Sequence, residues 1–224
     1  MDTETLEQKG MTTFEGTLKR AKEGNALSQN LLGLWILHGD LPEGVEVDED
    51  PFELIRMSAE QGFAAAQYNM GVILETGLGG KTADAAEEKL ALDWYRKAAN
   101  QGCKEAMTSV GWCLYKGICV EPNLSDALSW LKEAATRGDV RGQLLLAEIY
   151  AKDERCYSKD EALYWFCQLS QYESLRTPEL IGVKLPKKDD PVLMEFKKAD
   201  DESRPLRLVI PTLPRNFDRE SDRR

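Results

Sequence analysis

The sequence has no long apolar stretch. None of its apolar runs approaches the ~20 residues that a membrane-spanning helix needs. The N-terminal segment MDTETLEQKGMTTFEG also has neither the basic region nor the apolar region of a secretory signal. These two absences argue against membrane insertion and favour a cytoplasmic location.

Residues that carry metal or nucleophilic chemistry are also scarce. The chain has a single histidine and no Cys-x-x-Cys pair, so we expect no zinc site. Its five cysteines are irregularly spaced and odd in number, which indicates reduced thiols. A Ser-x-x-Lys element and a recognisable Ser–His–Asp arrangement are both missing. We therefore expect no metal, no cofactor and no catalysis, with a hydrolase as the weakest alternative.

Basic residues are fewer than acidic ones, 29 against 39, which gives a formal net charge of −10. Such a surface repels phosphates, so nucleic acid is not an expected ligand. The charge favours a basic protein or peptide partner, although solubility alone also explains it. The loop at residues 39–50 holds six carboxylates without the spacing of a calcium-binding loop, so it is expected to be a solvated acidic loop.

Proline is rare until residue 174, and six of the nine prolines follow it. Residues 175–224 carry 12 basic and 10 acidic residues, which leaves 17 and 29 in residues 1–174. A Pro-rich segment of mixed charge ordinarily stays extended or disordered. We therefore divide the chain into a leader (1–11), a folded domain (12–174) and an extended or disordered charged tail (175–224). Two apolar islands, 191–196 and 206–211, could dock this tail on the acidic domain.

A repeated pattern organises the folded domain. Glycines expected to end helices recur at intervals of 38, 40 and 36 residues: Gly24, Gly62, Gly102 and Gly138. Small residues follow each glycine at fixed offsets, as in the series Gly33, Gly71, Gly111 and Ala147. A period of this size indicates stacked helical hairpins that share one core. The small residues let helices approach closely, while the tryptophans at Trp94, Trp130 and Trp165 are expected to fill the space between hairpins.

The segments AQYNMG, ALDWYRKAANQG and DALSWLKEAATRG resemble the Sel-one-like repeats, which are relatives of tetratricopeptide repeats. The resemblance covers about residues 12–172. It implies an all-α fold: a right-handed α/α superhelix (solenoid) of about four helix-turn-helix repeats behind a capping helix at residues 12–23. Members of this family serve mainly as adaptors. The resemblance therefore implies a non-catalytic interaction scaffold that binds a protein or peptide partner in the concave groove of the solenoid.

The geometry of the related tetratricopeptide repeats also implies which side chains line the groove, because the first helix of each hairpin faces inward. This places eight residues there: Asn30, Leu34, His38, Tyr68, Val72, Trp112, Tyr115 and Lys116. The three aromatic residues among them form a strip, and aromatic side chains are common interface anchors. The alternative is that these rings pack between helices, and for Trp112 the sequence leaves both interpretations open. A second functional class also stays open, namely an immunity or inhibitor-type protein that neutralises one basic toxin or enzyme.

Overall fold

The computed structural model describes residues 3–78 and 85–169, and these residues form α-helices and no strand. Short turns that contain glycine (residues 23–25, 61–63, 101–103 and 137–139) alternate with longer connections such as the loop at residues 39–50. Their bounds are α1 (Thr3–Lys22), α2 (Ala26–His38), α3 (Pro51–Glu60), α4 (Ala64–Thr76), α5 (Ala85–Asn100), α6 (Lys104–Lys116), α7 (Leu124–Thr136), α8 (Val140–Lys152) and α9 (Lys159–Leu169).

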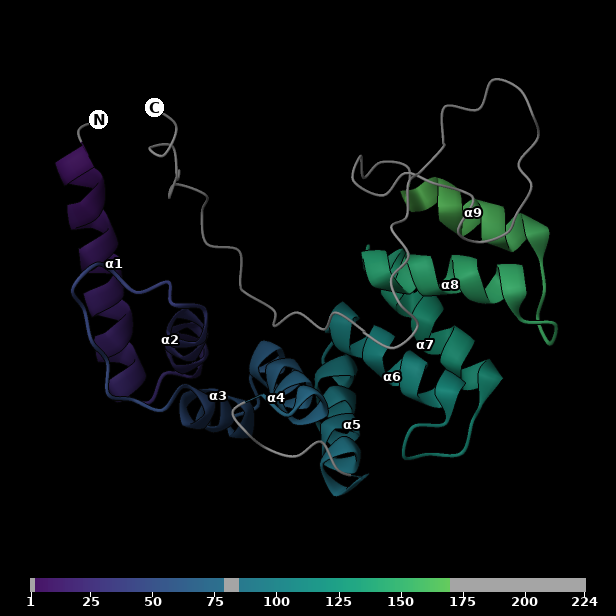
Figure 1. Cartoon of the computed structure of the whole chain (residues 1–224), viewed down its shortest axis with the longest axis horizontal. Coiled ribbons are helices and arrows are strands. Elements are labelled where there is room, and N and C mark those ends of the chain that lie inside the picture. Colours follow the sequence, from purple (N-terminus) through teal and green to yellow (C-terminus); the bar gives the residue numbers. More distant parts are fainter. Residues whose placement is uncertain (1–2, 79–84, 170–224) are drawn as a thin grey trace.

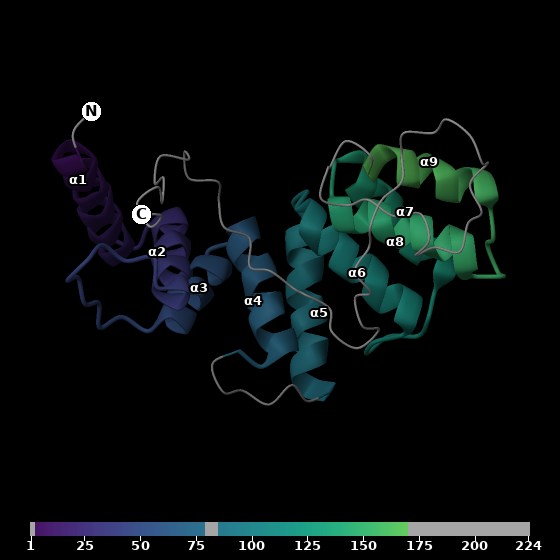
Figure 2. The ribbon, with the colours of Figure 1, turned by 45° about the horizontal axis from the view of Figure 1, so that its top comes forward.

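The helices follow one another along an arc from α1 to α9 (Figures 1 and 2). Each helix packs mainly on the helix before it and the helix after it, as expected for stacked hairpins. The pairs α2–α3, α4–α5, α6–α7 and α8–α9 form four repeat units, and α1 packs on α2 ahead of them. This confirms the all-α solenoid of four hairpins behind an N-terminal helix. That helix begins at Thr3, not at Thr12, so it takes in most of the expected leader. The Pro-rich tail lies outside the described residues.

Capping side chains and glycines define several helix ends. Asp50 precedes Pro51 and caps α3 by accepting a hydrogen bond from the backbone N–H of Phe52, at 3.0 Å. Asn123 caps α7 in the same way by accepting from the N–H of Asp126, at 3.1 Å. At the other ends, the repeated glycines adopt positive φ values, for example +91° at Gly102, as an abrupt helix stop requires.

The small residue in each first helix marks a close contact with the second helix of the same hairpin. A Cβ built on Gly71 would lie 2.4 Å from Cε1 of Tyr95, and one on Gly111 would lie 2.7 Å from Cγ of Leu131. Tyr95 and Leu131 are fully buried, whereas Trp94 and Trp130, one residue earlier, are half-buried. In units two and three, therefore, the residue after the tryptophan fills the hairpin, and the tryptophan itself lies at the edge of the core.

Gly71 offers a direct test of this close packing. We expect Gly71→Ala to lower the free energy of unfolding by about 2 kcal/mol, because the buried ring of Tyr95 has no room to move. Gly16 is the matched control: it lies within helix α1, and the nearest atom to an added Cβ is 3.9 Å away. Gly16→Ala should raise the free energy of unfolding by about 0.5–1 kcal/mol through helix propensity alone. Urea titrations followed by circular dichroism measure both, and the same sign for the two changes would contradict the packing argument.

Three buried glutamines tie α2 to α1, α4 to α3 and α8 to α7, a feature that the sequence patterns above did not predict. The side-chain amides of Gln29, Gln67 and Gln143 each donate to a backbone carbonyl eight residues earlier, at 3.3, 3.2 and 3.1 Å. Each glutamine directly follows the first small residue of its unit, so the shared offset was a usable signal. The same carbonyl groups also accept from the backbone N–H groups of Gly24, Gly62 and Gly138, so each glutamine adds a second hydrogen bond that joins its helix to the preceding one.

Candidate functional site

The first helices of the hairpins lie on the inner side of the arc. The evidence is a contact between repeat units that are not neighbours: Nη2 of Arg141 on α8 donates a hydrogen bond to the hydroxyl of Tyr68 on α4, at 3.1 Å. Helices α6 and α8, the first helices of adjacent units, also contact each other directly. Units two apart in a stack can touch only on the inside of its curve. The surface formed by α2, α4, α6 and α8, which we call the inner face, is therefore concave.

Curvature this tight buries half of the residues predicted to line the groove. Asn30, Leu34, Tyr68 and Val72 are at most 2% exposed. The ring of Tyr68 packs at 5.7 Å from that of Tyr95 and its hydroxyl accepts from Arg141, while Asn30 accepts a hydrogen bond from Asn69. A partner cannot reach these four side chains in the folded chain, so they hold the inner face together and do not present a binding surface.

The remaining predicted residues are accessible, and they lie at or near the C-terminal ends of the first helices. His38 and Lys116 are exposed, and Trp112 and Tyr115 are half-buried. His38 ends α2 and Lys116 ends α6, at equivalent positions of units one and three. The binding role of the eight residues stays a prediction. Because four of them are buried, the accessible candidates are His38, Trp112, Tyr115 and Lys116.

Trp112, Tyr115 and Lys116 form a compact cluster on the last turn of α6. The two rings lie 6.2 Å apart between centroids with a 39° angle between their planes. Nζ of Lys116 lies 4.8 Å from the centroid of the Trp112 ring and 5.7 Å from that of Tyr115. Cation–π attraction of this kind keeps the ammonium group above the rings. Among the residues that the structure describes, no carboxylate is within ion-pairing distance of Lys116.

Tyr115 connects this cluster to the loop between α8 and α9. It packs against the hydrophobic core cluster that spans units one to three and also against the cluster of units three and four. Cζ of Arg155 lies 5.7 Å from the Tyr115 ring, and Arg155 pairs with Asp153 at 2.6 Å. Burial and a hydrogen bond to Asp153 raise the pKa of Tyr115, while Arg155 holds the pKa of Asp153 well below its usual range. Tyr115 therefore contributes to the packing between units, whereas Trp112 belongs to none of the three core clusters of the described residues.

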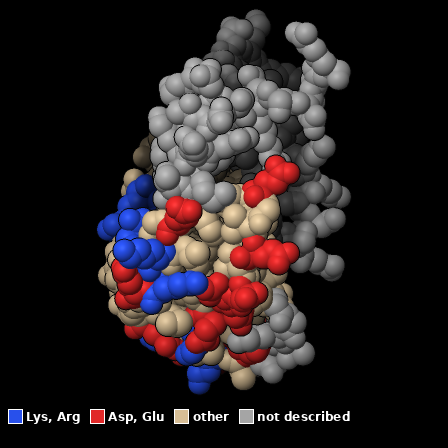
Figure 3. Space-filling model, turned by 90° about the vertical axis from the view of Figure 1, so that its left-hand side faces the viewer, with Lys and Arg blue, Asp and Glu red and all other residues tan. Residues whose placement is uncertain are grey.

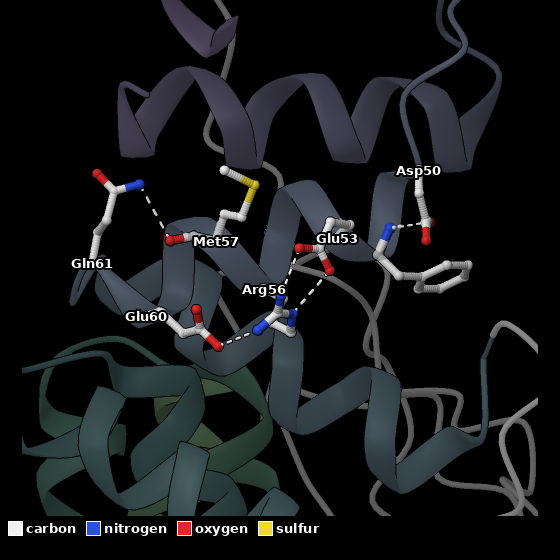
Figure 4. Close-up of polar contacts among 7 residues, drawn as sticks. Asp50, Glu53, Arg56, Met57, Glu60 and Gln61 are labelled. Carbon is white, nitrogen blue, oxygen red and sulfur yellow. Dashed lines mark hydrogen bonds and ion pairs between the residues drawn. The ribbon is translucent and has the colours of Figure 1, made fainter. Parts of the chain in front are cut away.

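One basic and two acidic side chains on α3 form a small ion-pair network. The guanidinium group of Arg56 bridges Glu53 and Glu60, at 2.5 Å to each, in the arrangement that Figure 4 shows. This hydrogen-bonded pairing lowers the pKa of Glu53. All three side chains are about half exposed, so the network contributes little to stability.

The N-terminal end of the solenoid carries much of the acidity. Acidic side chains, with basic ones among them, cover much of this end of the molecule (Figure 3). The loop between α2 and α3 belongs to it, and Lys22 on α1 pairs with Glu49 of this loop at 3.0 Å. Within the described part of the chain, no group of three or more His, Cys, Asp or Glu side chains is arranged to hold a metal ion.

The described thiols are poorly suited to nucleophilic chemistry. Cys103 and Cys156 are free cysteines, and both are half-buried. Burial raises the pKa of Cys103 to about 12, and the thiolate is the reactive form of cysteine. The pKa of the exposed Cys119 is also raised, by partial burial and by a contact with Glu88.

With this geometry in view, comparison with known proteins gives a clear match. The Sel1 repeat family model matches residues 26–51, which cover α2 and the loop after it, and residues 64–103 and 104–139, which cover hairpins two and three. The chain carries Sel1 repeats. Two solved structures share the solenoid at a TM-score of 0.60 over 72% of this chain: a Sel1 repeat protein from Oxalobacter formigenes, 27% identical, and a protective antigen of uropathogenic Escherichia coli with an SLR fold, 30% identical.

Relatives in sequence share only part of their length with this Sel1-repeat chain. Chitin synthase regulatory factor 3 of Schizosaccharomyces pombe is 38% identical over 97 residues, which are 42% of this chain and 10% of the yeast protein. An uncharacterised protein of Neisseria meningitidis is 31% identical over 100 residues, which are 45% of this chain and 19% of that protein. The matched regions also cover 64% and 34% of the two solved chains.

Sel1 repeats generally mediate protein–protein interactions and are typically non-enzymatic scaffolds. In the described residues, no helix combines the length and the apolar character needed to cross a bilayer. The family and the inner-face cluster therefore both point to recognition of another protein.

Proposed function

We propose that the chain is a non-catalytic adaptor that binds a protein or peptide partner on the inner face of its solenoid. The observation that most strongly supports this proposal is the cluster of Trp112, Tyr115 and Lys116, in which two half-buried rings and an exposed lysine lie together on that face. Aromatic residues of this kind contribute large contact areas at low entropic cost and are enriched among the strongest contributors to binding. The regulatory role named for the yeast relative is compatible with an adaptor.

Trp112 is the residue with which to test this proposal. We expect Trp112→Ala to abolish recovery of the partner when the purified chain captures proteins from its native host, because truncating a central aromatic anchor typically weakens binding at least tenfold. Tyr164 on α9 is a matched control, since it is an aromatic residue that is 52% exposed but lies on a second helix. Tyr164→Ala should recover the same partner as the wild type. If both variants fail to recover the partner, or if both recover it, the result would contradict a binding site on the inner face.

The acidity of the N-terminal end supports a more specific role as an alternative, namely inhibition of one basic toxin or enzyme (Figure 3). Electrostatic complementarity mainly accelerates association and is weakened by salt. An inhibitor would form a tight one-to-one complex whose association slows sharply with ionic strength. An adaptor would bind several partners more weakly, and stopped-flow measurements of the captured complex at 50 and 500 mM salt distinguish the two.

A further inference from the structure

The repeat itself shows what is unusual about Lys116. Units three and four place a lysine at the same position, at the end of the first helix: Lys116 on α6 and Lys152 on α8. In unit four, Glu148 stands four residues before the lysine and pairs with it at 2.8 Å. In unit three, the residue four positions before the lysine is Trp112. The unit-four lysine is thus neutralised within its own helix, whereas the unit-three lysine rests on an aromatic ring.

Building on the proposed function, we propose that Lys116 and Trp112 form the recognition site for an acidic side chain of the partner, followed or preceded by an apolar one. The ammonium group is exposed and has no carboxylate partner among the described residues, so a carboxylate can approach it without breaking an existing ion pair. The Trp112 ring beneath it offers an apolar surface to the neighbouring residue of the peptide.

Neighbouring charges favour this assignment. Arg155 lies against the other ring of the cluster, and its own charge is largely matched by Asp153. Glu148 is held by Lys152, so it does not compete for Lys116. The site therefore has a local positive charge although the whole chain has a net charge of −10. Net charge acts at long range and is screened beyond about 10 Å at 0.1 M salt, whereas this contact forms at short range. A partner that is basic overall can still insert one acidic side chain here.

The comparison of the two units supplies a selective variant. Trp112→Glu gives unit three the Glu–Lys pair of unit four, and we expect the new carboxylate to pair with Lys116 and occupy the site. The substitution should be tolerated, because Glu148 is half-buried at the equivalent position and Trp112 lies outside the described core clusters. Lys116→Gln removes the charge but leaves the ring. The matched control is Lys97→Gln, since Lys97 also lies over a tryptophan, Trp94, at 4.0 Å, but on the second helix α5.

The probes are an acetylated twelve-residue peptide in which glutamate and leucine alternate with glycine, and the same peptide with glutamine in place of glutamate. Calorimetry on the full chain measures affinity, and the indole N–H signal of Trp112 in NMR spectra reports the location. We expect the glutamate peptide to bind at least tenfold more tightly than the glutamine peptide and to shift the Trp112 signal. Trp112→Glu and Lys116→Gln should each weaken it about tenfold, and Lys97→Gln should not.

Equal binding of the two peptides, no detectable binding of the glutamate peptide, or full affinity in Trp112→Glu would each overturn the assignment. These outcomes are separate from failure of the adaptor proposal. If Trp112→Ala still loses the captured partner while the glutamate peptide does not bind, the inner face is the binding surface and only its acidic specificity is wrong. If Trp112→Ala retains the partner, the adaptor site itself lies elsewhere.

Discussion

Replacing Tyr95 by alanine is expected to lower the free energy of unfolding by about 4 kcal/mol, because large aromatic residues truncated in cores typically cost 3–5 kcal/mol. Tyr95 is 1% exposed, and its ring packs between α5 and α4 at 5.7 Å from that of Tyr68. The residue facing it is Gly71, which has no side chain that could move into the space left behind. The resulting cavity would stay largely open, which is the condition under which truncation costs most.

Two further variants make this prediction specific. Tyr95→Phe keeps the ring but removes the hydroxyl group that donates to Glu75 at 2.5 Å, and it should cost about 1 kcal/mol. Tyr157→Ala is the control for the substitution itself, because Tyr157 is 61% exposed, and it should change stability by less than about 0.5 kcal/mol. Urea unfolding followed by circular dichroism measures all three. A cost below 1 kcal/mol for Tyr95→Ala would show that α4 and α5 can close the gap.

Local patterns in the sequence were sufficient to predict the solenoid fold. The positions of Gly71 and Gly111 predicted close helix contacts, and recurring glycines such as Gly102 predicted helix ends, because each of these signals acts over a few residues. The burial of Tyr68 could not be predicted in the same way. It depends on how strongly the stack curves, and therefore on the long-range bond that brings Arg141 of unit four to unit two.

The same distinction applies to the candidate site. An offset within a first helix predicts that a residue faces inward, and this is enough to select Trp112, Tyr115 and Lys116. Whether a side chain at an inward position is accessible or buried depends on the neighbouring units. Leu34 and Val72 share the offset of Trp112 but are buried. The contrast between Trp112–Lys116 and Glu148–Lys152 was present in the sequence, but it acquires meaning only when the ion pair and the ring contact are seen.

Asp139 is expected to be the second most sensitive position tested, and Asp139→Ala should lower the free energy of unfolding by about 3 kcal/mol. Its carboxylate accepts from the N–H of Gly142, at 2.9 Å, and so caps α8. It also accepts from the hydroxyl of Thr108 on α6, at 2.6 Å, and both side chains are at most 5% exposed. The substitution therefore removes a helix cap and leaves a buried hydroxyl group without its acceptor.

The matched control for this prediction is Asp50→Ala, since Asp50 caps α3 with a single bond to Phe52 on an exposed surface. Loss of an N-cap alone should cost about 1 kcal/mol. The difference of about 2 kcal/mol between the two variants then measures what the buried Thr108 contact contributes at the junction of units three and four. Equal losses would show that Asp139 acts as a helix cap only, and that the stacking of α8 on α6 depends on apolar packing and on Arg141.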